Sequence, residues 1–284
     1  MRDVYPSAPK REWGDVVIEG KNFRVAGDKD DIYFKNLDGA VSSLRLLAPL
    51  AEAVVARDST ILDVGANIGI ATLMLANKNP NGKLYAFEPI PQVVDHLRAT
   101  ITEAALHHVD IIQTAIGDRT DRVAFHLGSN FSAGSHIVTQ SHISVDSTPT
   151  HLVPMNTIDE FARRFSVQKI DLIKIDTEGF EREVILGAKN CLERFKPVVF
   201  LEMNSWCLLA FRNMNPREFV EFLLAQFPKV FWVDHDKKLH PLKQGSGFHH
   251  FLHEHLVRHG CVTDLVCCSD DGWLSSFGAG RIEN

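Results

Sequence analysis

Short apolar runs and longer amphipathic segments alternate along most of the chain after about residue 58. Buried strands are predicted at 60–64, 83–88, 109–118, 170–176, 198–202, 229–234 and 265–268. Apolar residues at helical spacing follow most of these runs. Strands that alternate with helices in this way favour a parallel sheet. The pattern therefore predicts an α/β fold with a mostly parallel sheet.

The first part of the chain has a different pattern. Short β-like runs occur at 16–18, 23–25 and 32–34. Between 40 and 55 apolar residues recur at helical spacing, and Pro49 marks a possible kink. We therefore expect an N-terminal extension over 1–57, built from a β meander and a helix, ahead of a main domain over 58–284.

The alternation of strands and helices stops between residues 122 and 154. A β-like run at 123–127 is followed there by a polar stretch rich in Ser, His, Thr and Gly. Because long irregular excursions inside a domain are usually functional, we interpret 122–154 as an inserted lid segment that covers the substrate. Three histidines in or beside it could contact an acceptor or act as a base, or could be solvated loop residues: His126, His136 and His142.

The loop after the first strand of the main domain indicates what ligand it binds. Residues 63–69 read Asp-Val-Gly-Ala-Asn-Ile-Gly. Gly65 and Gly69 carry no Cβ, so the backbone can turn sharply and approach a ligand closely. Two of the three glycines of a dinucleotide fingerprint are missing, and no Walker lysine follows. The carboxylate of Asp63 also suits a cationic ligand better than a phosphate.

Carboxylates stand at the ends of several predicted strands. Four follow or end apolar runs: Asp63, Glu88, Asp176 and Glu202. Because the carboxyl ends of parallel strands meet at one edge of a sheet, we expect these four to converge. Like charges so close raise one another's pKa unless a cation or a proton lies among them. Glu88 could accept the hydroxyls of a ribose and Asp118 an adenine amino group, although Asp118 also suits a simple turn.

These motifs resemble the FkbM family of S-adenosylmethionine (SAM)-dependent methyltransferases. The resemblance covers about residues 59–234, and its most specific part is 174–181, Lys-Ile-Asp-Thr-Glu-Gly-Phe-Glu. It implies the class I methyltransferase fold, a Rossmann-like, mostly parallel seven-stranded sheet with helices on both faces. It also implies O-methylation of a hydroxyl on a sugar, glycan or polyketide-type small molecule.

The resemblance implies a role for each candidate residue. The cofactor would be bound by Asp63, Gly65, Asn67, Gly69, Glu88 and Asp118, and the methyl group and acceptor would be faced by Asp176, Glu202 and Glu178. We place Asp176 first and Glu202 second as the base that relieves the acceptor hydroxyl of its proton, with Glu178 supporting the turn. A divalent cation, Mg²⁺ or Ca²⁺, held by oxygen ligands and a nearby histidine is an open alternative, and no metal ligands are assigned.

Composition limits the partners of the protein. A net charge of -6 gives no basic footprint for nucleic acid. The sequence has no signal peptide, no apolar stretch long enough to span a membrane and no Cys-x-x-Cys pair, so we expect a cytoplasmic protein with reduced thiols. The histidines clustered between His249 and His259 are expected to be exposed. The expected partner is a hydroxylated small molecule or glycan, and the sequence leaves the oligomeric state open.

Two other functions fit the sequence. One is an N-methyltransferase on the same scaffold, in which the acids would hold an ammonium group. The other is a non-catalytic Rossmann-type binding module, although the 176–179 motif argues against it. An NAD-dependent enzyme is disfavoured by the missing glycines.

Overall fold

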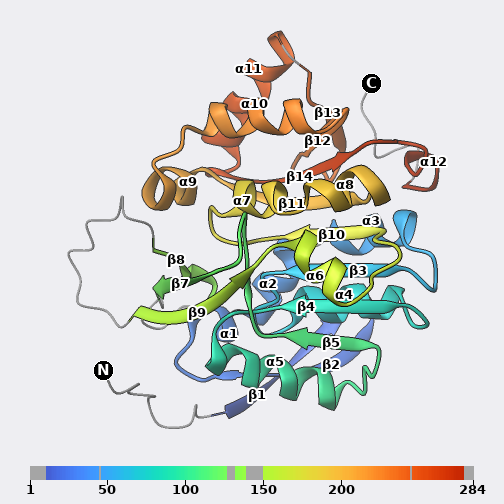
Figure 1. The fold of residues 1–284 in the computed structure, drawn as a ribbon, viewed down its shortest axis with the longest axis vertical. Coiled ribbons are helices and arrows are strands. Elements are labelled where there is room, and N and C mark those ends of the chain that lie inside the picture. Colours follow the sequence, from blue (N-terminus) through green and yellow to red (C-terminus); the bar gives the residue numbers. More distant parts are fainter. Residues whose placement is uncertain (1–10, 45, 127–131, 139–149, 244, 278–284) are drawn as a thin grey trace.

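The strands of the protein form three separate sheets, seen in a computed structural model that describes residues 11–44, 46–126, 132–138, 150–243 and 245–277. The main sheet has eight strands in the order β13-β12-β14-β11-β10-β3-β4-β5. Figure 1 shows them stacked in this order, with β5 near the bottom. The strands are β3 (Thr60–Val64), β4 (Lys83–Phe87), β5 (Val109–Ile112), β10 (Leu172–Ile175), β11 (Val198–Asn204), β12 (Lys229–Val233), β13 (Leu239–Pro241) and β14 (Val262–Cys268).

The main sheet confirms the predicted mostly parallel α/β fold. Strands β5, β4, β3, β10 and β11 are parallel, and β14 runs antiparallel between β11 and β12. The short strand β13 adds an eighth strand at the edge beyond the seven expected. The direction of the strand order reverses between β3 and β10. Ligands of such sheets bind outside the carboxyl ends of the strands at this reversal.

Helices cover both faces of the main sheet because neighbouring residues of its strands point to opposite sides. Leu172 packs in one core cluster and Ile173 in the other. The first cluster includes residues of α2 (Leu37–Ser43), α3 (Leu47–Val54), α4 (Ile70–Lys78), α5 (Pro91–Glu103) and α12 (Leu274–Phe277). The second includes residues of α6 (Ile158–Arg164), α7 (Glu181–Leu186), α8 (Lys189–Phe195), α9 (Ser205–Arg212), α10 (Pro216–Gln226) and α11 (Ser246–His253). A π-helical turn, η2 (Glu254–Arg258), follows α11, and none of the described helices is long and apolar enough to cross a membrane.

The N-terminal segment differs from its prediction in two places. Strands β1 (Arg11–Ile18) and β2 (Lys21–Asp28) form the expected hairpin, which packs against α5. The third run, predicted as a strand, is instead the short helix α1 (Ile32–Lys35), because the Asp31 carboxylate accepts the Phe34 N–H and caps a helical turn. The helix expected over 40–55 is two helices, α2 and α3. Pro49 does not kink it, since it lies in the first turn of α3, where no N–H is needed.

The predicted strand over 109–118 is divided between two sheets. Strand β5 ends at Ile112, and the chain then enters a four-stranded sheet of order β6-β9-β7-β8. These strands are β6 (Ala115–Ile116), β7 (Asp121–His126), β8 (His136–Ile137) and β9 (Thr150–Asn156). The insertion at 122–154 therefore contains strand pairs and a 3-10 turn, η1 (Ser132–Gly134), beside the main sheet (Figure 1). Its segments 127–131 and 139–149, with His142, lie outside the described residues.

A buried ion pair joins the two strands at the reversal point. Lys174 on β10 lies opposite Asp63 on β3, and both side chains are buried. The Lys174 Nζ lies 3.3 Å from Asp63 Oδ1, and the other carboxylate oxygen accepts the Thr72 hydroxyl of α4 at 2.6 Å. Burial alone would lower the pKa of the Lys174 ammonium, but the charges of Asp63 and Asp176 outweigh it and hold this pKa above its usual value.

Removal of the lysine charge is expected to destabilise the protein strongly. Lys174→Met leaves the Asp63 carboxylate buried without a cation, so its free energy of unfolding in urea should fall by about 3–5 kcal/mol. Adding Asp63→Asn to this variant removes the unpaired charge and should restore part of the loss. Lys83→Met, which breaks a half-exposed pair with Asp110, should cost less than about 1 kcal/mol. Equal losses for the two single lysine variants would contradict this account.

Candidate active site

Two adjoining cavities open at the carboxyl ends of β3 and β10. The first, here called the loop cavity, is lined by the 64–67 loop, the 87–90 segment and residues 114–116, and it has about 790 Å³ of empty space including its solvent-filled mouth. The second, here called the acid cavity, lies between the end of β11, helix α9 and η1. Six residues line both cavities: Tyr33, Leu44, Ala133, Lys174, Asp176 and Glu178.

The two glycines of the 63–69 loop serve different contacts. Gly65 has φ +81°, and a Cβ at this position would lie 1.8 Å from the backbone oxygen of Asp176. Only glycine therefore allows the loop to lie against the end of β10. Gly69 has φ +103° and faces Leu97 of α5, where a Cβ would be 2.9 Å from Cδ1. Gly69 does not line either cavity, so its predicted contact with a cofactor is replaced by a packing role beneath the loop.

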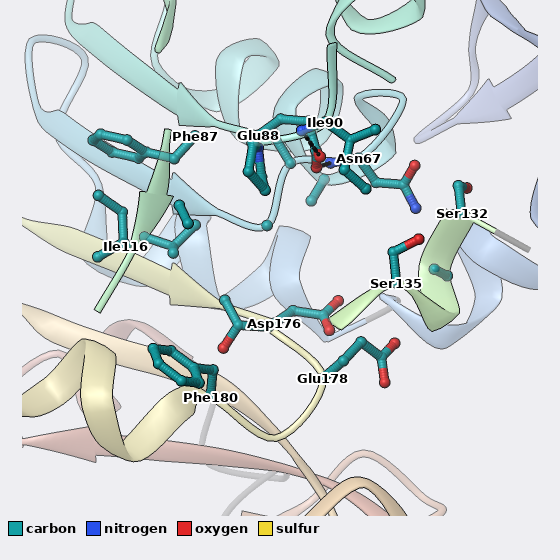
Figure 2. A pocket seen from close by; sticks show the side chains of 18 of the residues that line it. Asn67, Phe87, Glu88, Ile90, Ile116, Ser132, Ser135, Asp176, Glu178 and Phe180 are labelled. Carbon is teal, nitrogen blue, oxygen red and sulfur yellow. Dashed lines mark hydrogen bonds between the residues drawn. The ribbon is translucent and has the colours of Figure 1, made fainter. Parts of the chain in front are cut away.

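Asn67 and Glu88 form the upper wall of the loop cavity (Figure 2). The Glu88 carboxylate accepts the backbone N–H of Asn67 at 3.1 Å and that of Ile90 at 3.0 Å. Burial raises the pKa of Glu88 to about 7, and the two N–H groups oppose that rise. The Asn67 Oδ1 atom is buried and has no hydrogen-bond partner among the described residues. It is therefore an acceptor available to a ligand in the loop cavity.

Besides Gly69, two more of the predicted cofactor residues lie outside both cavities. Asp63 is fully buried and bonded to Lys174 and Thr72, so it holds the loop from beneath and is not exposed to a ligand. Asp118 is exposed and pairs with Arg119 at 3.0 Å. Its position does not fit the predicted contact with an adenine, because the chain leaves the main sheet after β5 and reaches Asp118 only beyond β6. Of the four acids predicted to converge, Asp63 is the one that does not reach the cavities.

The turn after β10 places Asp176 and Glu178 between the cavities. Figure 2 shows both side chains at this turn, below Glu88 and Ser135 in the view, and all four residues line the loop cavity. We predicted that Glu178 supports the turn, and this was wrong. The turn is held by Glu181, whose Oε1 accepts the N–H groups of Thr177 and Gly179 and the Thr177 hydroxyl. The Glu178 carboxylate accepts the thiol of Cys207 at 2.9 Å and lines both cavities.

Three carboxyl groups cluster on the floor of the acid cavity. Ligand oxygens of Asp176, Glu178 and Glu202 lie within 4.8 Å of one another, an arrangement that could hold a metal ion. Burial, reinforced by the charge of Asp176, raises the pKa of Glu178 to about 8 and that of Glu202 well above its usual range. The raised pKa values favour the protonated forms of these two groups, while Asp176 lies 3.5 Å from the Lys174 ammonium. Protons and a lysine thus already reduce the repulsion among the acids.

Two site residues were not identified from the sequence. Lys174 was noted only as part of a motif, although a charge inside an apolar run indicates a buried partner. Tyr33 lies on α1 of the extension and lines both cavities. Burial and the charge of Asp176 raise the pKa of its phenol, which stays protonated at neutral pH. The sequence predicted only a β-like run at 32–34 and gave no sign that Tyr33 lines the cavities.

The extension and the insertion meet above the cavities. Asp31, the cap of α1, accepts the backbone N–H of Ser132 in η1 at 2.7 Å. Ser132 and Ser135 line the loop cavity, and Ala133 and Gly134 line the acid cavity. The described part of the insertion therefore contributes to the lining of both cavities, and its role as a substrate cover stays a prediction.

Of the candidate histidines, the two that the structure describes, His126 and His136, line neither cavity. His126 and His136 lie opposite each other on β7 and β8, with ring centroids 5.2 Å apart. Among the late histidines, His249 and His253 are exposed as expected, but His255 is buried between the hydroxyls of Ser205 and Thr263. Burial lowers the pKa of His255 to about 4, so it is a neutral packing residue.

The charges of the two cavities limit the ligand they can bind. Within the described part of the chain, Lys174 is the only Lys or Arg that lines them, and Asp63 and Asp176 already engage it. A dinucleotide phosphate would therefore find no free cation beside the loop, whereas a cationic ligand would be attracted. A glycine loop at the reversal of a parallel sheet, next to an acid-lined cavity, defines an α/β enzyme that binds a nucleoside-type ligand.

Comparison with known proteins identifies the family. A model of the FkbM methyltransferase domain matches residues 63–226, which is more than half of the chain. The chain therefore belongs to the FkbM methyltransferase family, and the protein is a methyltransferase.

Characterised relatives are distant. The 2-O-methyltransferase NoeI of Sinorhizobium fredii is 26% identical over 166 residues, which cover 54% of this chain and 67% of that protein. The hexuronic acid methyltransferase AglP of Haloferax volcanii is 28% identical over 179 residues, covering 62% of this chain and 68% of that one. The solved FkbM methyltransferase of Methylobacillus flagellatus aligns with a TM-score of 0.47 and 12% identity over 81% of this chain and 60% of that chain.

We expect Gly65→Ala to abolish binding of SAM, because the added methyl group pushes the loop away from Asp176. Gly20→Ala is the matched control, since Gly20 also has a positive φ, +77°, but open space around its Cα. The control should lose about 1 kcal/mol of stability and no affinity. Titration calorimetry with SAM and S-adenosylhomocysteine measures both variants. Normal affinity in a folded Gly65→Ala protein would contradict the prediction.

The raised pKa of Glu178 predicts a pH dependence of stability. A carboxyl with a higher pKa in the folded protein than in the unfolded chain binds more protons when folded, so its contribution is lost as pH rises from about 4.5 to about 8. The free energy of unfolding in urea should therefore decline less steeply over this interval in Glu178→Gln than in the wild type. Glu218→Gln, on the exposed side of α10, should keep the wild-type slope. Identical slopes for all three proteins would contradict the assignment.

Proposed function

We propose that the protein transfers a methyl group from SAM to a hydroxyl group of a sugar-containing or other hydroxylated small molecule or glycan. The observation that carries this proposal is the meeting of the loop cavity and the acid cavity at Asp176. A donor in the first cavity and an acceptor in the second would then have their reacting atoms beside one carboxylate. The names of the relatives NoeI and AglP, a 2-O-methyltransferase and a hexuronic acid methyltransferase, support the same reaction class.

The residues of the loop cavity fit SAM. Gly65 lets the loop lie against the end of β10, and the unpartnered Asn67 Oδ1 can accept a hydrogen bond from the ligand. Glu88 has carboxylate lone pairs beyond those used by Asn67 and Ile90, which suit the hydroxyls of a ribose. SAM supplies a methyl group activated by a sulfonium charge, and the acids nearby favour that charge.

Asp176 is the proposed base. A hydroxyl group is a weak nucleophile while it keeps its proton, so the acceptor oxygen must lose the proton as its bond to the methyl carbon forms. The raised pKa values of Glu202 and Glu178 favour their protonated forms, which cannot accept a proton. Asp176 lines both cavities and is the remaining carboxylate of the cluster. Glu202 is then placed to orient the acceptor hydroxyl.

The experiment is incubation with methyl-labelled SAM and fractionated glycans and metabolites, with identification of the labelled products. We expect label in an ether formed from a hydroxyl group. Label on nitrogen would favour the N-methyltransferase alternative, and binding of SAM without transfer to any fraction would favour a non-catalytic module.

Because Lys174 already supplies a positive charge among the acids, we expect methyl transfer to survive exhaustive EDTA treatment. Loss of transfer after this treatment would support a bound cation.

Asp176→Asn should reduce turnover by at least about 100-fold, because the amide cannot accept the proton, and should leave the affinity for SAM nearly unchanged. Glu202→Gln should reduce turnover less. Asp110→Asn, an exposed carboxylate on the edge strand β5, is the control for loss of a charge and should have no effect. Initial rates and calorimetry together make this comparison. Normal turnover in Asp176→Asn would remove this residue from the mechanism.

A further inference from the structure

Part of the acid cavity wall is aromatic. Trp206 and Phe211 of α9 line the cavity, and their rings meet edge to face with centroids 5.0 Å apart. Phe211 also stacks on His136 of the insertion, with centroids 3.5 Å apart. Phe211 is thus fixed between two elements, and it supports the Trp206 ring at the side of the cavity.

Trp206 is exposed despite its size. Its relative exposure is 61%, compared with 37% for Trp13. Trp232, by contrast, is buried in the core. An exposed indole that lines a cavity offers a flat apolar face with a polar N–H at its edge. Such a face suits a ligand that has one apolar side and many polar groups around its rim.

The same cavity also offers hydrogen-bond acceptors and negative charge. Asp176 and Glu202 come from the ends of neighbouring strands, and Asp264 lies directly opposite Glu202 across β11 and β14. Carboxyl groups are suited to bind several hydroxyl groups of one ligand. A pyranose ring has both required surfaces, since its C–H bonds form apolar faces and its hydroxyls point outward.

Among the described residues, the cavity offers no unengaged cation for an anionic sugar. Lys174 is its only Lys or Arg within the described residues, and this ammonium already bonds to Gly65 O, Asp63 and Asp176. A uronic acid or sugar phosphate would therefore bring its charge close to Asp176 and Asp264, with no unengaged Lys or Arg among the described lining residues.

We propose that the acid cavity is a subsite for an uncharged sugar ring, which stacks on Trp206, points its hydroxyls at Asp176 and Glu202, and is selected over acidic sugars. This inference rests on the proposed function and narrows its acceptor. It distinguishes the protein from the relative named a hexuronic acid methyltransferase.

The test measures sugar binding directly, with S-adenosylhomocysteine present and no turnover. The probes are p-nitrophenyl glucoside, galactoside and mannoside, and the p-nitrophenyl glucuronide and galacturonide that differ from two of them only in a carboxylate. Affinities come from saturation-transfer NMR titrations. We expect at least one neutral glycoside to bind about 100-fold more tightly than its uronide, as expected when like charges face each other. A uronide that binds as tightly as its neutral counterpart, or no binding by any glycoside, would overturn the subsite.

Variants assign the binding to the aromatic wall. Trp206→Ala should weaken binding of the neutral glycoside by about 10-fold or more. Trp206→Phe should weaken it less, because the phenyl ring keeps part of the flat surface. Leu209→Ala is the matched control, since Leu209 is exposed on the same helix but does not line the cavity, and its affinity should equal that of the wild type. Asp264→Asn should reduce the preference for the neutral sugar over the uronide. Wild-type affinity in Trp206→Ala would refute the stacking role.

The outcomes separate this inference from the proposed function. Neutral sugars that bind through Trp206 but receive no methyl group would leave the subsite in place and contradict the proposed reaction. Methyl transfer to a hydroxyl with a rate unaffected by Trp206→Ala would support the reaction and contradict the subsite.

Discussion

The ammonium group of Lys174 bonds to Gly65 O at 2.8 Å and pairs with Asp63 and Asp176 at 3.3 and 3.5 Å. These partners belong to the glycine loop, to β3 and to the end of β10, so one cation positions the structural acid, the loop and the proposed base. Burial alone would disfavour the charged forms of Lys174, Asp63 and Asp176, and the attraction between the ammonium and the two carboxylates keeps all three charged. The carboxyl ends of the two central strands can carry several acids only because this cation lies among them.

The main sheet was predictable because it is buried. Apolar runs such as 60–64 and 198–202 are covered by helices on both faces, and their order along the chain determines a parallel sheet. The pattern of apolar residues within a run predicted the wrong element where a residue or strand outside the run determines the structure. The run at 32–34 is helical because Asp31 caps it, and the apolar run at 109–118 changes sheets at residues 113–114 to pair with β9. Pairing with β9 depends on a strand about 40 residues further along the chain, which the periodicity of the run does not encode.

The sequence predicted the location of the candidate site better than it predicted the role of each residue in it. Strand-end positions correctly brought Glu88, Asp176 and Glu202 to adjoining cavities. Position along the chain did not reveal which way each side chain points. Asp63 turns inward to Lys174, and the acid that supports the turn is Glu181, three residues from the one predicted. Tyr33 comes from a segment outside the family match and could be found only from its place in space.

The contact between Gly65 and the Asp176 carbonyl divides the molecule into a fixed part and an adjustable part. At this point loop and strand are too close to move independently, so the geometry of methyl delivery is set by the central sheet. The acid cavity, which is the proposed acceptor side, is lined by residues of β11 and β14 and also by α1, η1 and α9, which lie outside the main sheet. New acceptor preferences can therefore be engineered by exchanging these three outer segments, while the central strands and the glycine loop are kept unchanged.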